Sequence, residues 1–315
     1  MLSVLARRLL VTIPTLILVS IFVFALQKML PGDPVLALAG EDRDPETLAR
    51  LREVYRLNDP LWLQYYDWIK GAVRGDLGRS LRTGMPVTQM IVSKLPVTLQ
   101  LAVMSMGIAL LIGVPAGIIA AIRKGRAADY AANLFALSGL SVPNFWLGIM
   151  LIMLISVRWK LLPASGYVSP LDDFWQSMRT MIMPSFVLAT ALAASLMRHT
   201  RSAMLTVLRQ DYVRTARAKG LAERVVILRH AFFNALTPII TLAALLFGEL
   251  IAGAVLTEQI FTIPGFGKMI VDAVFNRDYP VVQGVTILAV TVYVLVNWLA
   301  DLLQLVADPR LRAPS

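Results

Sequence analysis

Six long stretches with almost no charged residues decide what this chain can fold into. An α-helix rises 1.5 Å per residue, so about 20 apolar residues cover the roughly 30 Å hydrocarbon core of a bilayer. Only the fifth stretch contains a charged residue, Glu249. We therefore predict an all-α polytopic membrane protein with six transmembrane helices, kinked at Pro14, Pro115, Pro143 and Pro184. The stretches cover residues 9–27, 95–122, 130–157, 180–197, 230–256 and 279–300.

Composition supports a membrane location and excludes several functions. Hydrophobic residues make up 57% of the 315 residues and charged residues 16%, which is too apolar for an ordinary soluble domain. The net charge of +10 is spread between apolar stretches and does not form the basic face that nucleic-acid binding requires. The absence of cysteine excludes disulfides and thiolate metal sites, and the two histidines, His199 and His230, both adjoin arginine. We expect no metal and no cofactor in this chain.

The distribution of lysine and arginine predicts the orientation. Residues 9–27 are expected to stay as a helix, because the segment that follows them lacks the small-x-small pattern of a signal-peptide cleavage site. With residues 1–8 and 307–315 in the cytoplasm, the inner segments contain fifteen Lys and Arg residues. The short outer loops then contain five, which satisfies the positive-inside rule. These five are Arg158, Lys160, Arg179, Lys268 and Arg277.

Residues 28–94 form a predicted periplasmic domain of a different kind. Two short amphipathic helices are expected, one starting near Asp44 with Pro45 in its first turn and one starting near Asp59. The second contains four aromatic residues, which we interpret as an interfacial anchor or, alternatively, as a cover over a substrate entrance. They are Trp62, Tyr65, Tyr66 and Trp68.

Residues 198–229, within the predicted permease core of residues 95–306, form a cytoplasmic loop with the pattern of helix, turn and helix. Asp211 begins a helix-compatible stretch, cations gather toward its end, and Gly220 stands where a left-handed cap is needed. Ala216 and Gly220, one turn apart, offer a small-residue face to a partner protein. A second helix is expected from Glu223 into the fifth stretch. A polybasic loop that contacts anionic lipid is the simpler alternative, but it does not account for the position of the glycine.

This loop resembles that of a known family. Residues 211–221, Asp-Tyr-Val-Arg-Thr-Ala-Arg-Ala-Lys-Gly-Leu, and residues 229–239, Arg-His-Ala-Phe-Phe-Asn-Ala-Leu-Thr-Pro-Ile, resemble the cytoplasmic loop of bacterial ABC-importer permeases. In that family the loop forms a coupling helix that docks into a cleft of an ATPase subunit. Arg214, Thr215 and Ala216 stand where Glu-Ala-Ala is usual, a departure typical of the peptide and nickel branch.

The resemblance extends over essentially the whole chain. Eight further segments look like those of the first (B-type) permease of dipeptide, oligopeptide, glutathione and nickel importers. This implies a type I ABC importer in the bacterial inner membrane, with a second homologous permease, two ABC ATPases and a periplasmic or lipid-anchored substrate-binding protein. The segments are residues 7–8, 31–35, 75–80, 141–146, 162–167, 256–267, 277–284 and 308–312.

The chain has no Gly-x-x-x-x-Gly-Lys-Ser/Thr loop, so we expect it to be no enzyme and ATP to be bound by the partner subunits. We expect the 211–221 helix to act as a lever when the ATPases close. Tyr212, Ala216 and Leu221 are the predicted contacts, and Arg214 and Lys219 are the charges at the rim. Asp211, Thr215 and Gly220 complete the predicted ATPase-coupling site.

Two residues are candidates for the translocation path. Glu249 is the one ionisable residue well inside a predicted span, so it is expected to face the bundle interior or a wet path, or to pair with a partner permease. Asn144 is the second candidate, although helix packing accounts for it equally well.

Other functional classes fit less well. An ion-coupled secondary transporter is expected to contain several intramembrane carboxylates or broken helices for ion coupling, and Glu249 alone is a poor supply. The sequence also shows no duplication of three-span halves, which argues mildly against an inverted-repeat transporter. An intramembrane protease lacks a base placed to activate Ser165. We therefore predict a permease of an ABC importer for dipeptides or oligopeptides, with glutathione or a nickel chelate as the alternative substrate.

Overall fold

The computed structural model describes residues 2–29, 35, 44–54 and 56–307. Within these residues the chain is helical, and pairing of the β type is limited to an isolated bridge between Arg79 and Pro86. The predicted all-α fold is confirmed. Residues 31–34, most of one family-like segment, and residues 308–312, the whole of another, lie outside the described residues. Most of the predicted C-terminal segment 307–315 also lies outside them.

The described helices run from α1 at the N-terminus to α14 at the C-terminus. In chain order they are α1 (Leu2–Met29), α3 (Pro45–Val54), α4 (Leu61–Val73), α5 (Val87–Ile122), α6 (Ala127–Ser141), α7 (Asn144–Leu151), the π-helix η1 (Ile152–Arg158), α8 (Phe174–Leu208), α9 (Asp211–Ala218), α10 (Glu223–Val225), the π-helix η2 (Val226–Phe232), α11 (Phe233–Gly253), α12 (Val255–Ile260), α13 (Phe266–Phe275) and α14 (Tyr279–Ala307).

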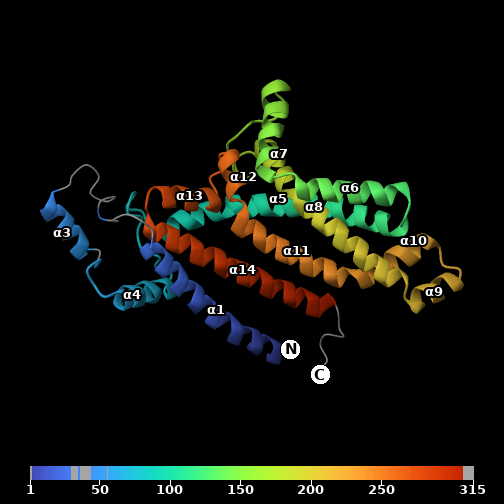
Figure 1. Cartoon of the computed structure of the whole chain (residues 1–315), viewed down its shortest axis with the longest axis horizontal. Helices are drawn as coiled ribbons and strands as arrows, with labels where there is room; N and C mark the ends of the chain where they lie inside the picture. The colour runs from blue at the N-terminus through green and yellow to red at the C-terminus, as the bar shows by residue number, and fades with distance from the viewer. Residues whose placement is uncertain (1, 30–34, 36–43, 55, 308–315) are drawn as a thin grey trace. The chain divides into compact units, whose positions relative to one another are not determined.

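The chain divides into two compact units, which are described separately. The first unit consists of residues 1–98 and 264–294, and the second of residues 99–263 and 295–315. Figure 1 labels the helices of both units.

In the first unit, the two predicted outer helices are present as α3 and α4. The four aromatic residues of α4 divide into two pairs. The Tyr65 hydroxyl lies 2.7 Å from the Ser20 hydroxyl of α1, and the Tyr65 and Trp68 rings both pack on Phe24 of α1. Trp62 and Tyr66 remain exposed. Tyr65 and Trp68 therefore pack α4 against α1, whereas Trp62 and Tyr66 remain available to the membrane interface.

The remainder of the first unit is built where two distant motifs meet. Asp278, directly before α14, accepts hydrogen bonds from the Ser80 hydroxyl and from the Leu81 backbone N–H. Gly284 on α14 approaches so closely that an added Cβ would lie 2.6 Å from a Val87 methyl carbon. The motifs at residues 75–80 and 277–284 thus form one packed structure, with an apolar cluster from α5, α13 and α14 beneath it.

In the second unit, α8 occupies the centre. Of its most apolar 18-residue window, 67% is buried, against 28–39% for the other long apolar helices, and it packs against both α6 and α11 (Figure 1). Glycines permit the close approach of α5: a Cβ added at Gly113 or Gly117 would lie 2.6 Å from a carbonyl oxygen of α8. This small-xxx-small spacing is typical of tightly packed membrane helices.

Four of the six predicted spans are present as long apolar helices, and the first and third differ from expectation. In the described residues, α5, α8, α11 with the segment before it, and α14 are each long and apolar enough to cross a membrane, and residues 12–26 of α1 form a shorter apolar helix. The third predicted span, residues 130–157, is broken: α6 and the α7–η1 helix meet at 95°. The break falls at Val142 and Pro143, because proline removes a backbone donor and disfavours helix at the preceding residue. The kink predicted at Pro143 is therefore a full bend.

Candidate functional site

The predicted coupling segment is a short helix, α9, between two turns. The N–H of Gln210 bonds to the Val207 carbonyl at 3.0 Å, and an extended Gln210 redirects the chain at the end of α8. Asp211 opens α9, where an acidic side chain interacts favourably with the helix dipole. The helix predicted for residues 211–219 is confirmed to within one residue at its C-terminal end.

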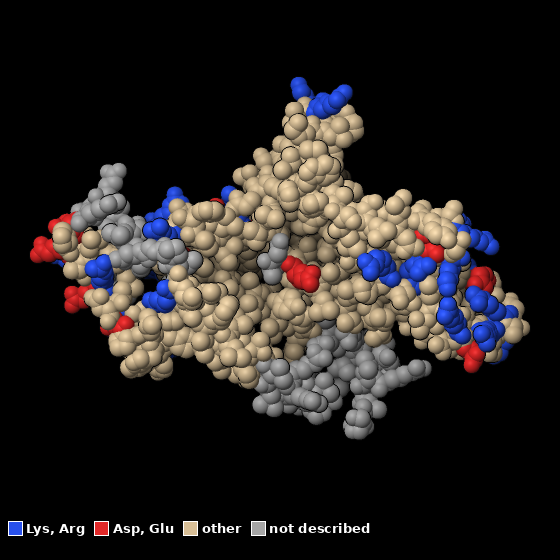
Figure 2. Space-filling model, viewed as in Figure 1, with Lys and Arg blue, Asp and Glu red and all other residues tan. Residues whose placement is uncertain are grey.

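One face of α9 is anchored within this chain. Val213 and Ala216 are buried and form a cluster with Val226 of η2, and Val207 and Leu208 of α8 pack against it. α9 is thereby fixed both to the helix that precedes it and to the helix that follows it. α9 and α10 lie at one end of the second unit (Figure 1). Figure 2 shows Lys and Arg side chains gathered at that end.

The C-terminal turn of α9 has the predicted left-handed cap. Gly220 has φ +74°, its N–H bonds to the Arg217 carbonyl at 2.9 Å, and the Leu221 N–H reaches the Ala216 carbonyl at 3.4 Å. These bonds satisfy carbonyl groups that the end of a helix leaves unpaired. A Cβ added at Gly220 would meet no atom within 4 Å, so the glycine is required by the backbone conformation and not by a close neighbour.

An ion pair closes the loop between α9 and α10. The Arg217 guanidinium donates two hydrogen bonds to the Glu223 carboxylate, at 2.6 and 3.1 Å. This bidentate geometry is the stronger form of an arginine–carboxylate contact, and it raises the pKa of Arg217 above its ordinary value. The pair links the last turn of α9 to the start of α10 across the turn at residues 219–222.

The opposite face of α9 points outward. Tyr212 is 43% exposed and Leu221 40% exposed, and Arg214, Thr215 and Lys219 are exposed beside them. The Arg214 guanidinium lies 3.6 Å from the Asp211 carboxylate. The outward face of α9 and its cap therefore combines the side chains of Tyr212 and Leu221 with charged residues beside them.

Ala216 differs from expectation. It was expected to belong to a small-residue face open to a partner, but it is 6% exposed and packs inward on Val213 and Val226. Helical spacing alone does not decide the direction, because Ala216 is three residues from Val213 and four from Tyr212. The packing of Ala216 with the buried Val213 and Val226 decides it. Ala216 anchors α9 and does not belong to its outward surface.

The helix after α9 is continuous with the fifth predicted span but is not regular. α10 passes into the π-helix η2 and then into α11, which holds Glu249. π-helical turns widen the backbone locally and often occur at functional positions. The segment that joins α9 to the span thus contains a built-in irregularity that the sequence did not indicate.

Sequence reasoning also missed an ion pair that fixes α6 to α8. The Arg201 guanidinium donates to both oxygens of Asp129, at 2.6 and 2.8 Å. The same carboxylate accepts from the Gly125 N–H and from the Asn133 amide, both at 2.9 Å. Asp129 is buried and fully hydrogen-bonded, so α6 and the end of α8 that leads into α9 are firmly joined. Asp129 lies directly before the apolar stretch of residues 130–157. An acid at that position was a feature of the sequence that could have indicated this ion pair.

The two candidate path residues lie on separate helices of the second unit. Glu249 is exposed on α11, so its carboxylate is accessible on the surface of this chain. Asn144 is half-buried at the first position of α7, directly after the bend at Pro143. A fully buried acid, Glu258 of α12, was not singled out by the sequence. Its segment, residues 256–267, pointed to the family but not to a role for this carboxylate.

Two family profiles match the chain. Residues 1–102 match the family profile described as "Binding-prot-dependent transport system membrane comp, N-term", and residues 113–313 match "Binding-protein-dependent transport system inner membrane component". The dipeptide transport system permease protein DppB of Escherichia coli (strain K12) is 44% identical over an alignment of 336 positions, which covers 99% of each chain. The oligopeptide transport system permease protein AppB of Bacillus subtilis (strain 168) is 42% identical, over 97% of this chain and 98% of that one.

A solved structure shares the fold. A chain of the MetNI methionine ABC transporter in inward-facing conformations aligns with a TM-score of 0.57 at 16% identity, covering 70% of this chain and 97% of that chain. Together with the apolar helices, these matches make the protein a multi-pass inner-membrane permease. The chain belongs to the family of binding-protein-dependent transport system inner membrane components, the permease subunits of ABC importers.

Proposed function

We propose that this permease couples ATP hydrolysis in partner ATPases to the import of dipeptides or oligopeptides, through α9. The proposal rests on one observation: α9 packs within this chain on one face and is exposed on the other. Its inner face is fixed to α8 and η2 by Val213 and Ala216, and its outer face presents Tyr212 and Leu221. A helix that is rigid on one side and accessible on the other can transmit a push from a partner.

The contacts of α9 support its role as a lever. It begins three residues after the end of α8 and is followed by the segment that becomes α11, and these two long helices pack on each other. The Gly220 cap and the Arg217–Glu223 pair keep the turn from absorbing the displacement. Closure of the ATPases would then tilt α8 and α11 together, and the Asp129–Arg201 pair would carry α6 with them.

The coupling surface in this proposal consists of the outward residues of the helix and its cap. Tyr212 and Leu221 enter the ATPase cleft, while the charged and polar residues bond around its rim. Ala216 and Gly220 act indirectly, by holding the helix in its place. The rim consists of Asp211, Arg214, Thr215 and Lys219.

The proposed assembly contains a second homologous permease, two ABC ATPases that bind ATP and a periplasmic or lipid-anchored substrate-binding protein. This chain takes no part in hydrolysis and binds no cofactor. Its N- and C-termini face the cytoplasm, as the positive-inside rule predicts. Glu249 and Asn144 are the proposed residues of the translocation path, and the exposed position of Glu249 suits contact with a peptide amino group or with the second permease.

The peptide substrate is inferred from the relatives. DppB and AppB are named for dipeptide and oligopeptide transport. Glutathione or a nickel chelate remains the alternative, because much of the selection in such a system belongs to the binding protein.

The test compares Tyr212→Ala with Tyr66→Ala, which removes another exposed aromatic ring, from α4. Each variant is purified from detergent-solubilised membranes, and the co-purified ATPase, its hydrolysis rate and peptide uptake are measured. We expect Tyr212→Ala to lose ATPase association and uptake and Tyr66→Ala to retain both. Unchanged association and uptake in Tyr212→Ala would reject α9 as the coupling element, and an active solitary chain would reject the importer.

A further inference from the structure

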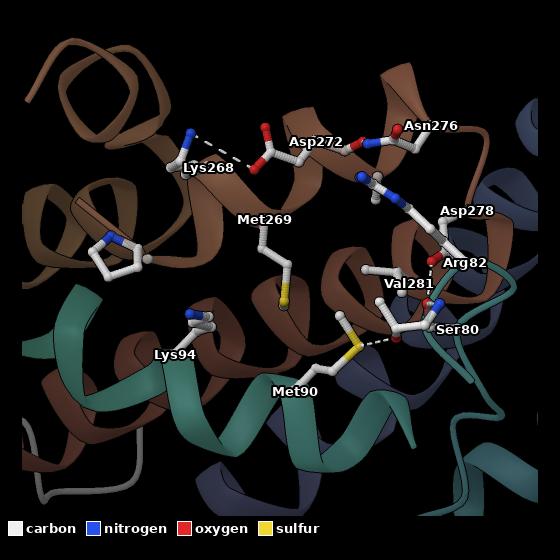
Figure 3. Close-up of a pocket in the computed structure, with 14 residues that line it drawn as sticks. Ser80, Arg82, Met90, Lys94, Lys268, Met269, Asp272, Asn276, Asp278 and Val281 are labelled. Carbon is white, nitrogen blue, oxygen red and sulfur yellow. Dashed lines mark hydrogen bonds and ion pairs between the residues drawn. The ribbon is translucent and has the colours of Figure 1, made fainter. Parts of the chain in front are cut away.

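A cavity of about 220 Å³ lies within the first unit, and its lining includes none of the proposed coupling or path residues. It is enclosed by the turn at residues 80–83, the start of α5, α13 and the start of α14. Figure 3 shows Met90 and Met269 reaching into the space from opposite sides, with Lys94 and Arg82 on opposite sides of the view. The volume is below the roughly 300 Å³ at which small-molecule sites usually begin, so it suits a head group better than a whole peptide.

The charges that line the cavity leave one positive charge to be balanced. Three cations and two carboxylates line it: Arg82, Lys94 and Lys268 with Asp272 and Asp278. Lys268 lies 3.7 Å from Asp272, and Asp278 is buried and bonded to Ser80 and Leu81. Among the described residues, no carboxylate lies within ion-pair distance of Arg82 or Lys94. A ligand with one negative charge would therefore neutralise the cavity.

Two independent features place the cavity at the surface of the bilayer. Lys94 directly precedes the charge-free stretch of α5, and Asp278 directly precedes that of α14, so both helices enter the hydrocarbon beside the cavity. On α13, which lines the cavity, Phe275 is 83% exposed and Val274 is also exposed. Exposed apolar side chains next to cations are typical of a surface that lies in the interfacial layer.

We propose that this cavity binds the phosphate of an anionic phospholipid head group from the outer leaflet. Arg82 and Lys94 would donate to the phosphodiester, Lys268 would contribute at the rim without leaving Asp272, and the methionine walls would contact the glycerol and the first acyl carbons. Lysine suits this position, because its aliphatic stem lies along apolar surface while the ammonium reaches the head-group layer. The inference goes beyond the proposed function and depends neither on the transported solute nor on α9.

The experiment measures lipid retention by the full transporter. The purified complex is titrated with dioleoyl phosphatidylglycerol or dioleoyl phosphatidylethanolamine, and bound lipid is counted by native mass spectrometry. The variants are Lys94→Gln and Arg82→Gln, alone and together. Lys70→Gln is the matched control, since it removes an exposed cation of the same outer region that does not line the cavity. Lys94→Arg keeps the charge and serves as the conservative variant.

We expect the parent, Lys70→Gln and Lys94→Arg to prefer phosphatidylglycerol. Each single glutamine variant should bind it about fivefold more weakly, the ratio that corresponds to about 1 kcal/mol for one cation at a membrane surface. Since the single variants leave the Asp278 and Asp272 contacts intact, they test the proposal even if the double variant is unstable.

Four results would overturn the proposal. Equal retention of both lipids by the parent, or unchanged retention in the glutamine variants, would exclude an anionic lipid at this site. Displacement of the lipid by millimolar inorganic phosphate would assign the cavity to free phosphate. Loss of binding-protein docking with unchanged lipid retention would assign the cations to an acidic partner protein.

Discussion

The close contact between α5 and α8 predicts opposite effects for the same substitution at two glycines. At Gly117, an added Cβ would lie 2.6 Å from the Met197 carbonyl oxygen and 2.6 Å from the Thr200 Cβ. Neither atom is the far end of a flexible side chain, so the two helices must separate. At Gly107, on the same helix, an added Cβ would meet nothing within 4 Å.

The expected free energies follow from these surroundings. Overpacking a close-packed interior costs about 1 to 3 kcal/mol, whereas replacing a mid-helix glycine by alanine in open space stabilises by about 0.5 to 1 kcal/mol. Gly117→Ala and Gly107→Ala should therefore differ in free energy of unfolding by about 1.5 to 4 kcal/mol.

The assay is thermal unfolding of the detergent-solubilised chain carrying a fluorescent protein, followed by size-exclusion chromatography. We expect Gly117→Ala to lose the monodisperse peak at a lower temperature than the parent and Gly107→Ala at an equal or higher one. Equal shifts for the two variants would refute the packing of α5 on α8.

Three further predictions concern polar contacts and caps. Arg201→Met leaves the buried Asp129 carboxylate without its guanidinium partner and should cost about 3 to 5 kcal/mol; adding Asp129→Asn should restore much of the thermal stability, and no recovery would contradict the pairing. Gly220→Ala should cost about 1 to 2 kcal/mol through its left-handed backbone and lower uptake per assembled transporter, whereas Gly220→Asn should lower it less; the reverse order would refute the cap. Asp278→Ala removes the acceptor of two donors, at about 1 to 3 kcal/mol for each one left unsatisfied. It should speed trypsin cleavage within residues 74–82, and an unchanged cleavage rate would argue against that contact.

Local patterns predicted those parts of the fold that local physics controls. The apolar stretches gave the long helices, and Pro45 and Asp59 marked the starts of the outer helices α3 and α4. Asp211 and Gly220 marked the two ends of α9, because a helix N-terminus favours an acid and a left-handed cap favours glycine. Each of these signals acts over a few neighbouring residues and can be read without knowing what packs against them.

Contacts between distant residues were not predictable in the same way. Asp129 and Arg201 are 72 residues apart, and Ser80 and Asp278 are 198 apart. Nothing in the local sequence links either pair. The inward direction of Ala216 likewise depends on Val226, which belongs to the next helix. The bend at Pro143 was expected as a kink, but its size depends on how α6 and α7 pack on α8.

The central claim is that the outward face of α9 docks on an ATPase, and the absence of cysteine from this chain permits a direct test. Tyr212→Cys and Leu221→Cys would each introduce a single accessible thiol on the coupling surface, and Leu171→Cys would place one in the loop before α8 as a control. The transporter is treated with a short thiol-to-amine cross-linker in the absence and presence of ATP. We predict that both α9 thiols cross-link to an ATPase subunit and that Leu171→Cys does not. Failure of both α9 positions to cross-link in a complex that hydrolyses ATP and transports would contradict the account.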